Sequence, residues 1–466
     1  MTLARSGILG AALLIVAGCT HAKPTTLAAN RAPSALAIAA DPHLIEMSVE
    51  ATTTLVAASS TSQLGVRFQI RALDLPASQR PALNLTLVLD TSGSMEGEAI
   101  VALRSSANRL IKQMRDGDRV AIVAFHSKVD VLVPNTPINA PARKRITRAI
   151  DGIASRGTTD LAAGLAAGLQ QVEAGRLPNG INRIVLFTDG VPNAPAALPG
   201  LVVAARQAGI GVTTLGFGID YDTTLLTQMA RDTGGTFRYV ETPEAVAEVF
   251  DSELTKMTTV VGRNLQLVLV PGPGVTIEPM QGLNIAGDGK AYATIGDLAS
   301  GELRDLMIPI KVSARGDGAT AELIDATLSF DDVVNRSGRQ QRDGFVTVKA
   351  ANDPIAVKKA VKIDLEVQRI RAGAASAMLD AIALARQGQL DQGRKRIATA
   401  MELVRAATTR LQDPELAKVV GQLEDLLKQL QQFTVVPGPA PAAAPASVEV
   451  RVRRTEEAAT RAVSGR

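Results

Sequence analysis

Between residues 84 and 257 the chain alternates strand patterns with helix patterns, and this alternation limits the fold more than any other feature of the sequence. Short apolar runs such as 84–89 and 183–187 have the length and composition of buried strands. Segments such as 97–114 and 160–173 place apolar residues three or four positions apart, which predicts amphipathic helices. Strands that alternate with helices predict an α/β fold with a doubly wound, mostly parallel sheet.

Polar residues gather where two of these strands end. Asp90, Ser92 and Ser94 stand at alternate positions after the first strand. Asp189 follows a later strand, and Thr159 belongs to a Gly-Thr-Thr-Asp segment between the two. Because the carboxyl ends of parallel strands meet at one edge of a sheet, segments that are distant in sequence converge there. We therefore expect these side chains to surround one site.

The five side chains offer two carboxylates and three hydroxyls, and no thiolate or imidazole. All are hard oxygen ligands, which suit Mg²⁺, Mn²⁺ or Ca²⁺ and argue against zinc or copper. Neutral hydroxyls leave most of the charge of the ion unneutralised, so the ion can accept a carboxylate from another molecule. The alternative is that Asp90 caps a turn and the hydroxyls cap the helix that begins near Gly97.

In type and order these residues resemble the metal-ion-dependent adhesion site of von Willebrand factor type A domains, whose pattern is D-x-S-x-S, then a distant threonine, then an aspartate. The resemblance covers about residues 84–250 and assigns these positions to Asp90, Ser92, Ser94, Thr159 and Asp189. Thr159 is preferred over Thr158 because it directly precedes Asp160, as in the G-x-T-[ND] segment of the family. The resemblance implies that the three hydroxyls bind a Mg²⁺-type ion directly, that the aspartates act mostly through water, and that a partner's Asp or Glu takes the sixth position.

The segments on either side of this region have a different pattern. Residues 44–80 hold two strand-like runs, and residues 260–350 hold several short ones separated by turns rich in Gly, Pro and Asp. This pattern is typical of a β-sandwich. We expect both segments to form one β-sandwich into which the α/β domain, residues 84–257, is inserted. The arrangement resembles bacterial surface proteins in which a type A domain sits within a β-sandwich.

The C-terminal part is predicted to be helical at first and then disordered. Residues 354–433 carry apolar residues at helical spacing, with helices expected at 356–387, 390–411 and 414–433. Residues 434–466 are rich in Pro and Ala and then charged, a composition typical of disorder.

The single cysteine of the chain, Cys19, follows a short apolar run at 8–17. This run has a positive residue before it and is too short to span a bilayer as a mature helix. It ends in Val-Ala-Gly-Cys, which resembles a bacterial lipobox, whose cysteine is lipid-modified. We therefore expect a lipoprotein signal peptide over 1–18, and a lipidated Cys19 with a flexible tether over 19–43. The alternative is a plain secretory signal.

The expected location follows from the lipid anchor. Thr20 stands where the known inner-membrane retention signal of such lipoproteins has an aspartate, so the outer membrane is favoured. We expect an exported protein that meets the membrane through the lipid only and faces the periplasm or the cell surface. A chain with one cysteine forms no disulfide within itself.

Two function classes are disfavoured by the sequence. The net charge is only +4, and no basic stripe is interleaved with aromatic residues, so nucleic-acid binding is not expected. We also expect no enzymatic activity, because the sequence holds no nucleophile–histidine pair, no Walker loop and no second metal cluster.

Two hypotheses for the function remain. The first is a lipid-anchored envelope protein that binds an acidic residue of a protein partner through a Mg²⁺-type ion. The second is a structural or assembly scaffold of the envelope, in which the helical C-terminal part binds and the metal only stabilises the edge of the sheet.

Overall fold

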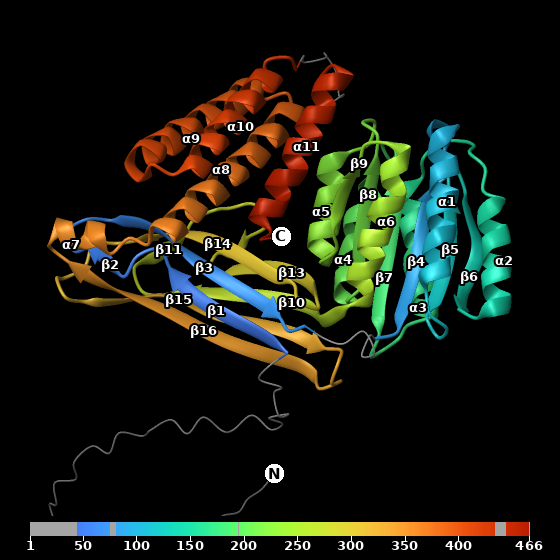
Figure 1. Cartoon of the computed structure of the whole chain (residues 1–466), viewed down its shortest axis with the longest axis horizontal. Coiled ribbons are helices and arrows are strands. Elements are labelled where there is room, and N and C mark those ends of the chain that lie inside the picture. Colours follow the sequence, from blue (N-terminus) through green and yellow to red (C-terminus); the bar gives the residue numbers. More distant parts are fainter. Residues whose placement is uncertain (1–43, 75–80, 194, 434–443, 466) are drawn as a thin grey trace, which may run out of the picture. The chain divides into compact units, whose positions relative to one another are not determined.

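The computed structural model describes residues 44–74, 81–193, 195–433 and 444–465. The predicted signal peptide, the tether and Cys19 lie outside the described residues. The described part forms an α/β domain, a β-sandwich and a group of C-terminal helices (Figure 1). Within it, no helix combines the length and the hydropathy that a membrane span requires.

The α/β domain is built on a six-stranded sheet with the order β6-β5-β4-β7-β8-β9. Its strands are β4 (Leu83–Asp90), β5 (Arg119–Phe125), β6 (Val129–Pro137), β7 (Ile181–Thr188), β8 (Gly211–Phe217) and β9 (Phe237–Val240). Neighbouring strands run parallel except at one edge, where β6 pairs antiparallel with β5. The carboxyl ends of β4 and β7 therefore lie side by side.

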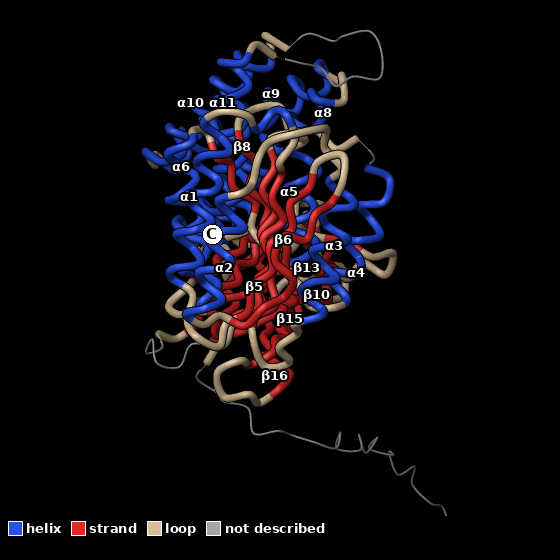
Figure 2. The backbone as a smooth tube through the Cα atoms, turned by 90° about the vertical axis from the view of Figure 1, so that its right-hand side faces the viewer, coloured by secondary structure: helices blue, strands red, loops and turns tan. Residues whose placement is uncertain are grey.

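Helices cover both faces of this sheet, as Figure 2 shows. These helices are α1 (Glu98–Gln113), α2 (Ala140–Asp151) and α6 (Pro243–Thr258) on one face, and α3 (Leu161–Ala174), α4 (Leu198–Gln207) and α5 (Thr223–Thr233) on the other. Leu87 of β4 is buried in a core with Phe250 of α6, whereas the next residue, Val88, is buried in a core with Leu226 of α5. Both faces of the strand are thus apolar, and the predicted doubly wound fold is confirmed.

The β-sandwich combines strands from before and after the α/β domain. One sheet has the order β1-β3-β14-β11 and the other β12-β13-β10-β15-β16-β2. The strands are β1 (Ile45–Ala51), β2 (Leu55–Ala57), β3 (Ser62–Ala72), β10 (Val260–Pro271), β11 (Val275–Ile277), β12 (Asn284–Ile285), β13 (Ala291–Ala299), β14 (Leu303–Val312), β15 (Thr320–Asp332) and β16 (Gly338–Ala351). Phe68 of β3 and Phe330 of β15 lie in one core between the two sheets. The α/β domain is inserted between β3 and β10, as predicted.

The predicted helix at 356–387 is wrong in one respect, because the structure divides it in two. The chain leaves the helical conformation where Val361 forms a β-bridge with Thr53 and the backbone N–H of Lys362 donates to the carbonyl of Thr52 at 2.8 Å. Pairing with the sandwich therefore replaces helical hydrogen bonds at this point. The helices of the C-terminal part are α7 (Pro354–Lys359), α8 (Ile363–Arg386), α9 (Leu390–Leu411), α10 (Pro414–Leu430) and α11 (Ala446–Val463).

The prediction of disorder over 434–466 is wrong for residues 446–463, which form α11, while residues 434–443 lie outside the described part of the chain. Val448 of α11 is buried in a core shared with α8, α9 and α10. Arg386 of α8 lies 3.1 Å from the carboxylate of Glu449 and 2.9 Å from that of Glu456. Charges of a kind usually found in solvent are thus paired between helices, and the loss of either partner would leave the other buried and unpaired.

Arg453 attaches α11 to the α/β domain. Its side chain is only 4% exposed, and its guanidinium donates to the carbonyls of Ile219 and Tyr221 at 2.7 and 3.0 Å and to the hydroxyl of Thr223. The guanidinium also lies over the ring of Tyr221, 4.1 Å from its centroid. One residue of α11 therefore fixes the loop between β8 and α5.

Replacing Arg453 with alanine should loosen α11. The substitution leaves the carbonyls of Ile219 and Tyr221 without their donor in a buried place, which is costly. We expect backbone amides of α11 to exchange with deuterium at least about tenfold faster than in the unaltered chain, measured by mass spectrometry.

The matched control is Arg451→Ala, an exposed arginine on the same helix, which should leave the exchange rates unchanged. Equal exchange in Arg453→Ala and the unaltered chain would contradict the attachment described above.

Candidate metal centre

Four of the five predicted residues are joined by hydrogen bonds at the carboxyl ends of β4 and β7. The backbone N–H of Ser92 donates to Asp90 Oδ1 at 2.9 Å. The Oγ atoms of Ser92 and Ser94 are 3.0 Å apart, and Ser94 Oγ donates to Asp189 Oδ1 at 2.8 Å. The parallel pairing of β4 with β7 brings these two distant segments together. The convergence expected from the sequence is present for Asp90, Ser92, Ser94 and Asp189.

Thr159 lies against the loop that follows β7. A Cβ atom added to Gly190 would be 3.0 Å from Thr159 Oγ1, so this hydroxyl is beside the residue after Asp189. The carbonyl of Thr159 accepts a hydrogen bond from the backbone N–H of Asn193 at 3.1 Å. Asp160 caps α3, where its side chain accepts from the backbone N–H of Ala163 at 3.0 Å. This cap fixes the start of α3 directly after Thr159.

Thr188 is a part of the site that the sequence reasoning missed. It is the last residue of β7, and its hydroxyl donates to Asp90 Oδ2 at 2.5 Å. Thr188 Oγ1 in turn accepts from the backbone N–H of Gly190 at 3.3 Å. The only signal in the sequence is its place directly before Asp189. Because a threonine is also an ordinary residue for the end of a strand, the sequence does not reveal that Thr188 orients Asp90.

Most side chains of the centre are buried, but the centre is open to solvent at Ser94. Asp90, Ser92 and Thr159 are buried, whereas Ser94 is exposed. Val191, two residues after Asp189 in the sequence, is also exposed. A group from another molecule can therefore reach the centre past Ser94.

Burial changes the protonation of both carboxyl groups. It raises the pKa of Asp90, although hydrogen bonds from Thr188 and Ser92 oppose this shift. Burial also raises the pKa of Asp189 to about 6; the hydrogen bond from Ser94 opposes this rise, and the nearby charge of Asp90 adds to it. Two buried carboxylates this close repel each other, and a divalent cation between them would remove that cost.

The oxygen spacing fits a small divalent cation. In an octahedron with metal–oxygen distances of about 2.1 Å, neighbouring oxygens are about 3.0 Å apart. The separation of 3.0 Å between Ser92 Oγ and Ser94 Oγ, the two hydroxyls expected to bind the ion directly, agrees with this spacing. Within the described part of the chain, no group of three or more His, Cys, Asp or Glu side chains could hold a metal ion. A metal in this place would therefore depend on hydroxyl ligands.

Comparison with known families identifies the α/β domain. Residues 84–252 match the family model of the von Willebrand factor type A domain. The chain contains a type A domain. The match agrees closely with the extent of the resemblance predicted from the sequence, and the fold of the six-stranded sheet supports it.

Two relatives match a little less than half of this chain. The uncharacterised protein YfbK of Escherichia coli (strain K12) is 30% identical over 222 residues, which cover 46% of this chain and 38% of YfbK. The uncharacterised protein sll0103 of Synechocystis is 30% identical over 223 residues, which cover 47% of this chain and 52% of sll0103. The matched regions thus span about half or less of these relatives.

One solved structure extends the similarity beyond the type A domain. It is a von Willebrand factor type A protein from Catenulispora acidiphila, with a TM-score of 0.67 and 18% sequence identity. The superposition covers 90% of this chain and 97% of that one. At this identity the likeness concerns the fold alone, and it includes the β-sandwich and C-terminal helices as well as the type A domain.

The raised pKa of Asp189 predicts how pH changes stability in the absence of divalent cations. The unfolded carboxyl ionises near pH 3.8 and the folded one near pH 6, so the stability present below pH 4 is lost as pH rises to 6. Asparagine does not titrate and can accept the same hydrogen bond from Ser94. Asp189→Asn should therefore raise the free energy of unfolding by about 2–3 kcal/mol at pH 7.5 and hardly at pH 4, measured by urea denaturation.

The control for this prediction is Asp391→Asn, whose side chain is 97% exposed and should have little effect at either pH. If Asp189→Asn destabilised the metal-free chain at pH 7.5, the electrostatic description of the centre would be wrong.

Proposed function

We propose that this chain is a lipid-anchored protein of the cell envelope whose type A domain binds a protein partner through a divalent cation. The cation is Mg²⁺ in the first place, with Mn²⁺ or Ca²⁺ as alternatives. The partner supplies an Asp or Glu side chain. The observation that carries the proposal is that the hydroxyls of Ser92 and Ser94 lie 3.0 Å apart beside the carboxylate of Asp189, with Ser94 open to solvent.

Each residue has a role in this proposal. The hydroxyls of Ser92, Ser94 and Thr159 would hold the ion directly, while Asp90 and Asp189 would balance its charge, mostly through water. When bound, the ion supplies a positive charge that an incoming carboxylate can neutralise. Thr188 and the backbone N–H of Ser92 keep Asp90 in place from the protein side.

The opening of the centre supports a ligand from outside. A structural ion would gain nothing from an accessible position, whereas Ser94 at this centre is exposed. We therefore favour partner binding over a purely structural metal. The absence of catalytic activity belongs to the same proposal.

The lipid anchor is the second part of the proposal. It rests on Cys19 and the apolar run before it, which lie outside the described residues. An anchor of this kind would hold the type A domain in the envelope, with the outer membrane favoured. The protein would then contact the membrane through its lipid and the partner through its type A domain.

The binding proposal predicts a partner whose capture needs both the ion and Ser92. The immobilised chain should retain a protein from envelope extract in Mg²⁺ and release it when Mg²⁺ is chelated. Ser92→Ala should lose at least about tenfold in affinity, because it removes one ligand hydroxyl while the buried fold around it stays intact. Retention can be measured by quantitative mass spectrometry.

Ser105→Ala is the matched control, since Ser105 is an exposed serine on α1 away from the centre. It should retain the partner as the unaltered chain does. If capture survived both chelation and Ser92→Ala, while Ser92→Ala lowered stability, the scaffold hypothesis would replace metal-dependent binding.

Cys19→Ser tests the anchor separately. The chain holds no other cysteine, so the substitution removes every thiol that could be acylated. In a bacterial host fed with labelled palmitate, we expect the label in the unaltered chain and none in the variant, which should also leave the membrane fraction. An unlabelled wild-type chain would show that the segment is a plain secretory signal.

A further inference from the structure

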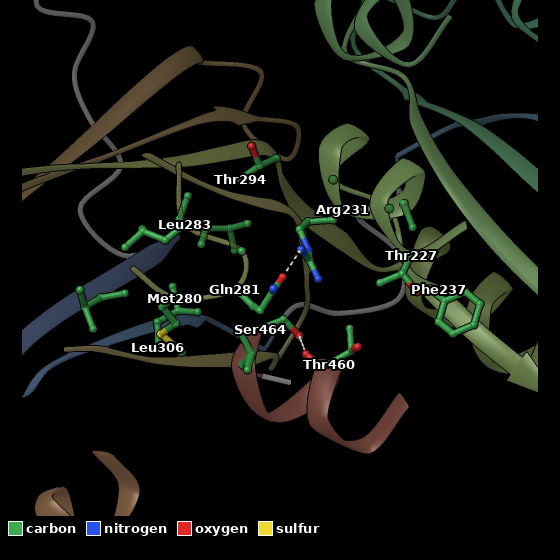
Figure 3. A pocket seen from close by; sticks show the side chains of 18 residues that line it. Thr227, Arg231, Phe237, Met280, Gln281, Leu283, Thr294, Leu306, Thr460 and Ser464 are labelled. Carbon is green, nitrogen blue, oxygen red and sulfur yellow. Dashed lines mark hydrogen bonds between the residues drawn. The ribbon is translucent and has the colours of Figure 1, made fainter. Parts of the chain in front are cut away.

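A pocket lies where the type A domain, the β-sandwich and α11 meet (Figure 3). Its walls come from α5, from the loop before β12, from β13 and β14, and from the last turn of α11. The apolar part of the lining includes Ala230, Leu283, Ile295, Leu306 and Val463. The pocket has a volume of about 80 Å³ and adjoins a more polar cleft of about 300 Å³. A water molecule needs roughly 10–15 Å³ in this measure, so the pocket has room for several waters or a small hydrocarbon group.

Two hydroxyl groups in the lining are buried without a partner. Thr227 Oγ1 on α5 and Thr460 Oγ1 on α11 form no hydrogen bond within the described structure. Thr227 is 8% exposed as a whole residue. A buried hydroxyl without a partner costs about 1–3 kcal/mol, and native proteins usually satisfy such groups with water or a ligand. Two of them lining one pocket, on different elements, indicate that a polar group belongs there.

Arg231 brings a positive charge to the same place. Its Nη1 donates to Gln281 Oε1 at 3.2 Å, as Figure 3 shows, and among the described residues it has no ion pair. Gln281 is held in turn by Asp380, whose Oδ1 accepts from its Nε2 at 2.7 Å. A guanidinium has five N–H donors and binds a carboxylate in a bidentate manner. Arg231 therefore has donors to spare beside an apolar pocket.

The acidic groups near Arg231 do not take up this capacity. Burial lowers the pKa of the Arg231 guanidinium, and the charges of Asp232 and Glu456 only partly oppose this effect. Glu456, which lines the adjoining cleft, is already bound by Arg386 at 2.9 Å. A carboxylate from a ligand would therefore improve the electrostatic environment of Arg231.

We infer that this pocket binds a carboxylate attached to a small branched apolar group. The carboxylate would lie against Arg231 and accept from the hydroxyls of Thr227 and Thr460. The apolar group would lie between Leu283, Leu306 and the neighbouring apolar walls. Both a short branched fatty acid and a leucine-like amino acid have this chemistry, and the adjoining polar cleft leaves space for the amino group of the latter.

Ligand binding here should be coupled to the docking of α11. Thr460, Val463 and Ser464 form one wall of the pocket, so the complete site exists only while α11 is in place. A ligand that binds only the docked form stabilises it by mass action. The pocket is separate from the metal centre. The inference about its ligand therefore does not depend on the proposed partner binding.

The test uses the full chain in buffer freed of divalent cations, so that no carboxylate can bind through a metal. The probes are 4-methylpentanoate, leucine and the neutral 4-methylpentanamide, with binding measured by ligand-observed NMR and calorimetry. We expect at least one of the two acids to bind with a dissociation constant of about 1 mM or below, typical of a good ligand of this size. The amide should bind at least tenfold more weakly. Asp90→Ala should bind the acid unchanged, which separates this site from the metal centre.

Substitutions in the lining test whether the acid binds in this pocket. Arg231→Gln should weaken binding of the acid at least tenfold, and Thr227→Val, which keeps the side-chain shape, should weaken it severalfold. Arg206→Gln is the matched control, because Arg206 is an exposed arginine on α4 that does not line this pocket. If Arg231→Gln failed to fold, Thr227→Val and Leu283→Trp, which fills the pocket, would decide the matter.

Three results would overturn the inference. The first is that neither acid binds at 10 mM or below, a limit set roughly tenfold above the expected affinity. The second is that the amide binds as well as the acid, and the third is that acid binding survives Thr227→Val and Leu283→Trp. The first would mean that the pocket holds ordered water only, the second that Arg231 does not select a carboxylate, and the third that the acid binds elsewhere on the chain.

Discussion

The parallel pairing of β4 with β7 is the constraint on which the candidate metal centre depends. The two strands are separated by about ninety residues of sequence, yet Leu89 of β4 and Phe187 of β7 are partners in the sheet. The polar residues that follow Leu89 and Phe187 in the sequence therefore lie at the same edge of the sheet. The hydrogen bonds from Thr188 to Asp90 and from Ser94 to Asp189 then cross between the two segments in both directions. A site of this kind cannot form unless the sheet has formed first.

The charges of the centre lower the stability of the metal-free chain. Burial disfavours the charged forms of Asp90 and Asp189, and the two carboxylates repel each other. Hydroxyl and backbone donors offset part of this cost without removing it. Strain of this type is common at functional sites, where it is relieved by the ligand that the site binds. These electrostatics support the proposed cation, whose charge would offset the repulsion between the two carboxylates.

Helix α11 gives the type A domain a second set of contacts, far along the chain from the metal centre. Arg453 holds the loop between β8 and α5, and Arg386 binds two carboxylates on the side of α11 that faces α8. The pocket beside Arg231 exists only because these contacts bring α11 against α5 and the sandwich. The C-terminal helix therefore joins parts of the protein that the sequence presents as separate.

Much of the fold could be predicted from the sequence, because buried strands and amphipathic helices leave strong periodic patterns. The positions of Asp90 and Asp189 at strand ends followed from the same patterns, since topology alone brings such ends together. Composition does not predict the ordered α11, because a segment rich in Pro and Ala and then in charge is typical of disorder. Its apolar residues Val448, Val452, Ala459 and Val463 have helical spacing and were the signal that could have revealed it.

Other features had no signal in the sequence. The break between α7 and α8 arises from a bridge between Val361 and Thr53, a contact over three hundred residues apart in the chain. The hydrogen bond from Thr188 to Asp90 and the unsatisfied hydroxyls of Thr227 and Thr460 depend on side-chain positions that only the folded structure defines. The periodicity of a local sequence segment does not predict contacts of this kind between distant residues.

The most direct test of the central claim is the position of a bound ion. Crystals of the chain grown with Mn²⁺ would be measured for anomalous scattering at the manganese edge. The account predicts one strong peak within about 2.5 Å of the hydroxyl oxygens of Ser92, Ser94 and Thr159. A peak elsewhere, or no peak at saturating Mn²⁺, with the same side chains still hydrogen-bonded to one another, would contradict it.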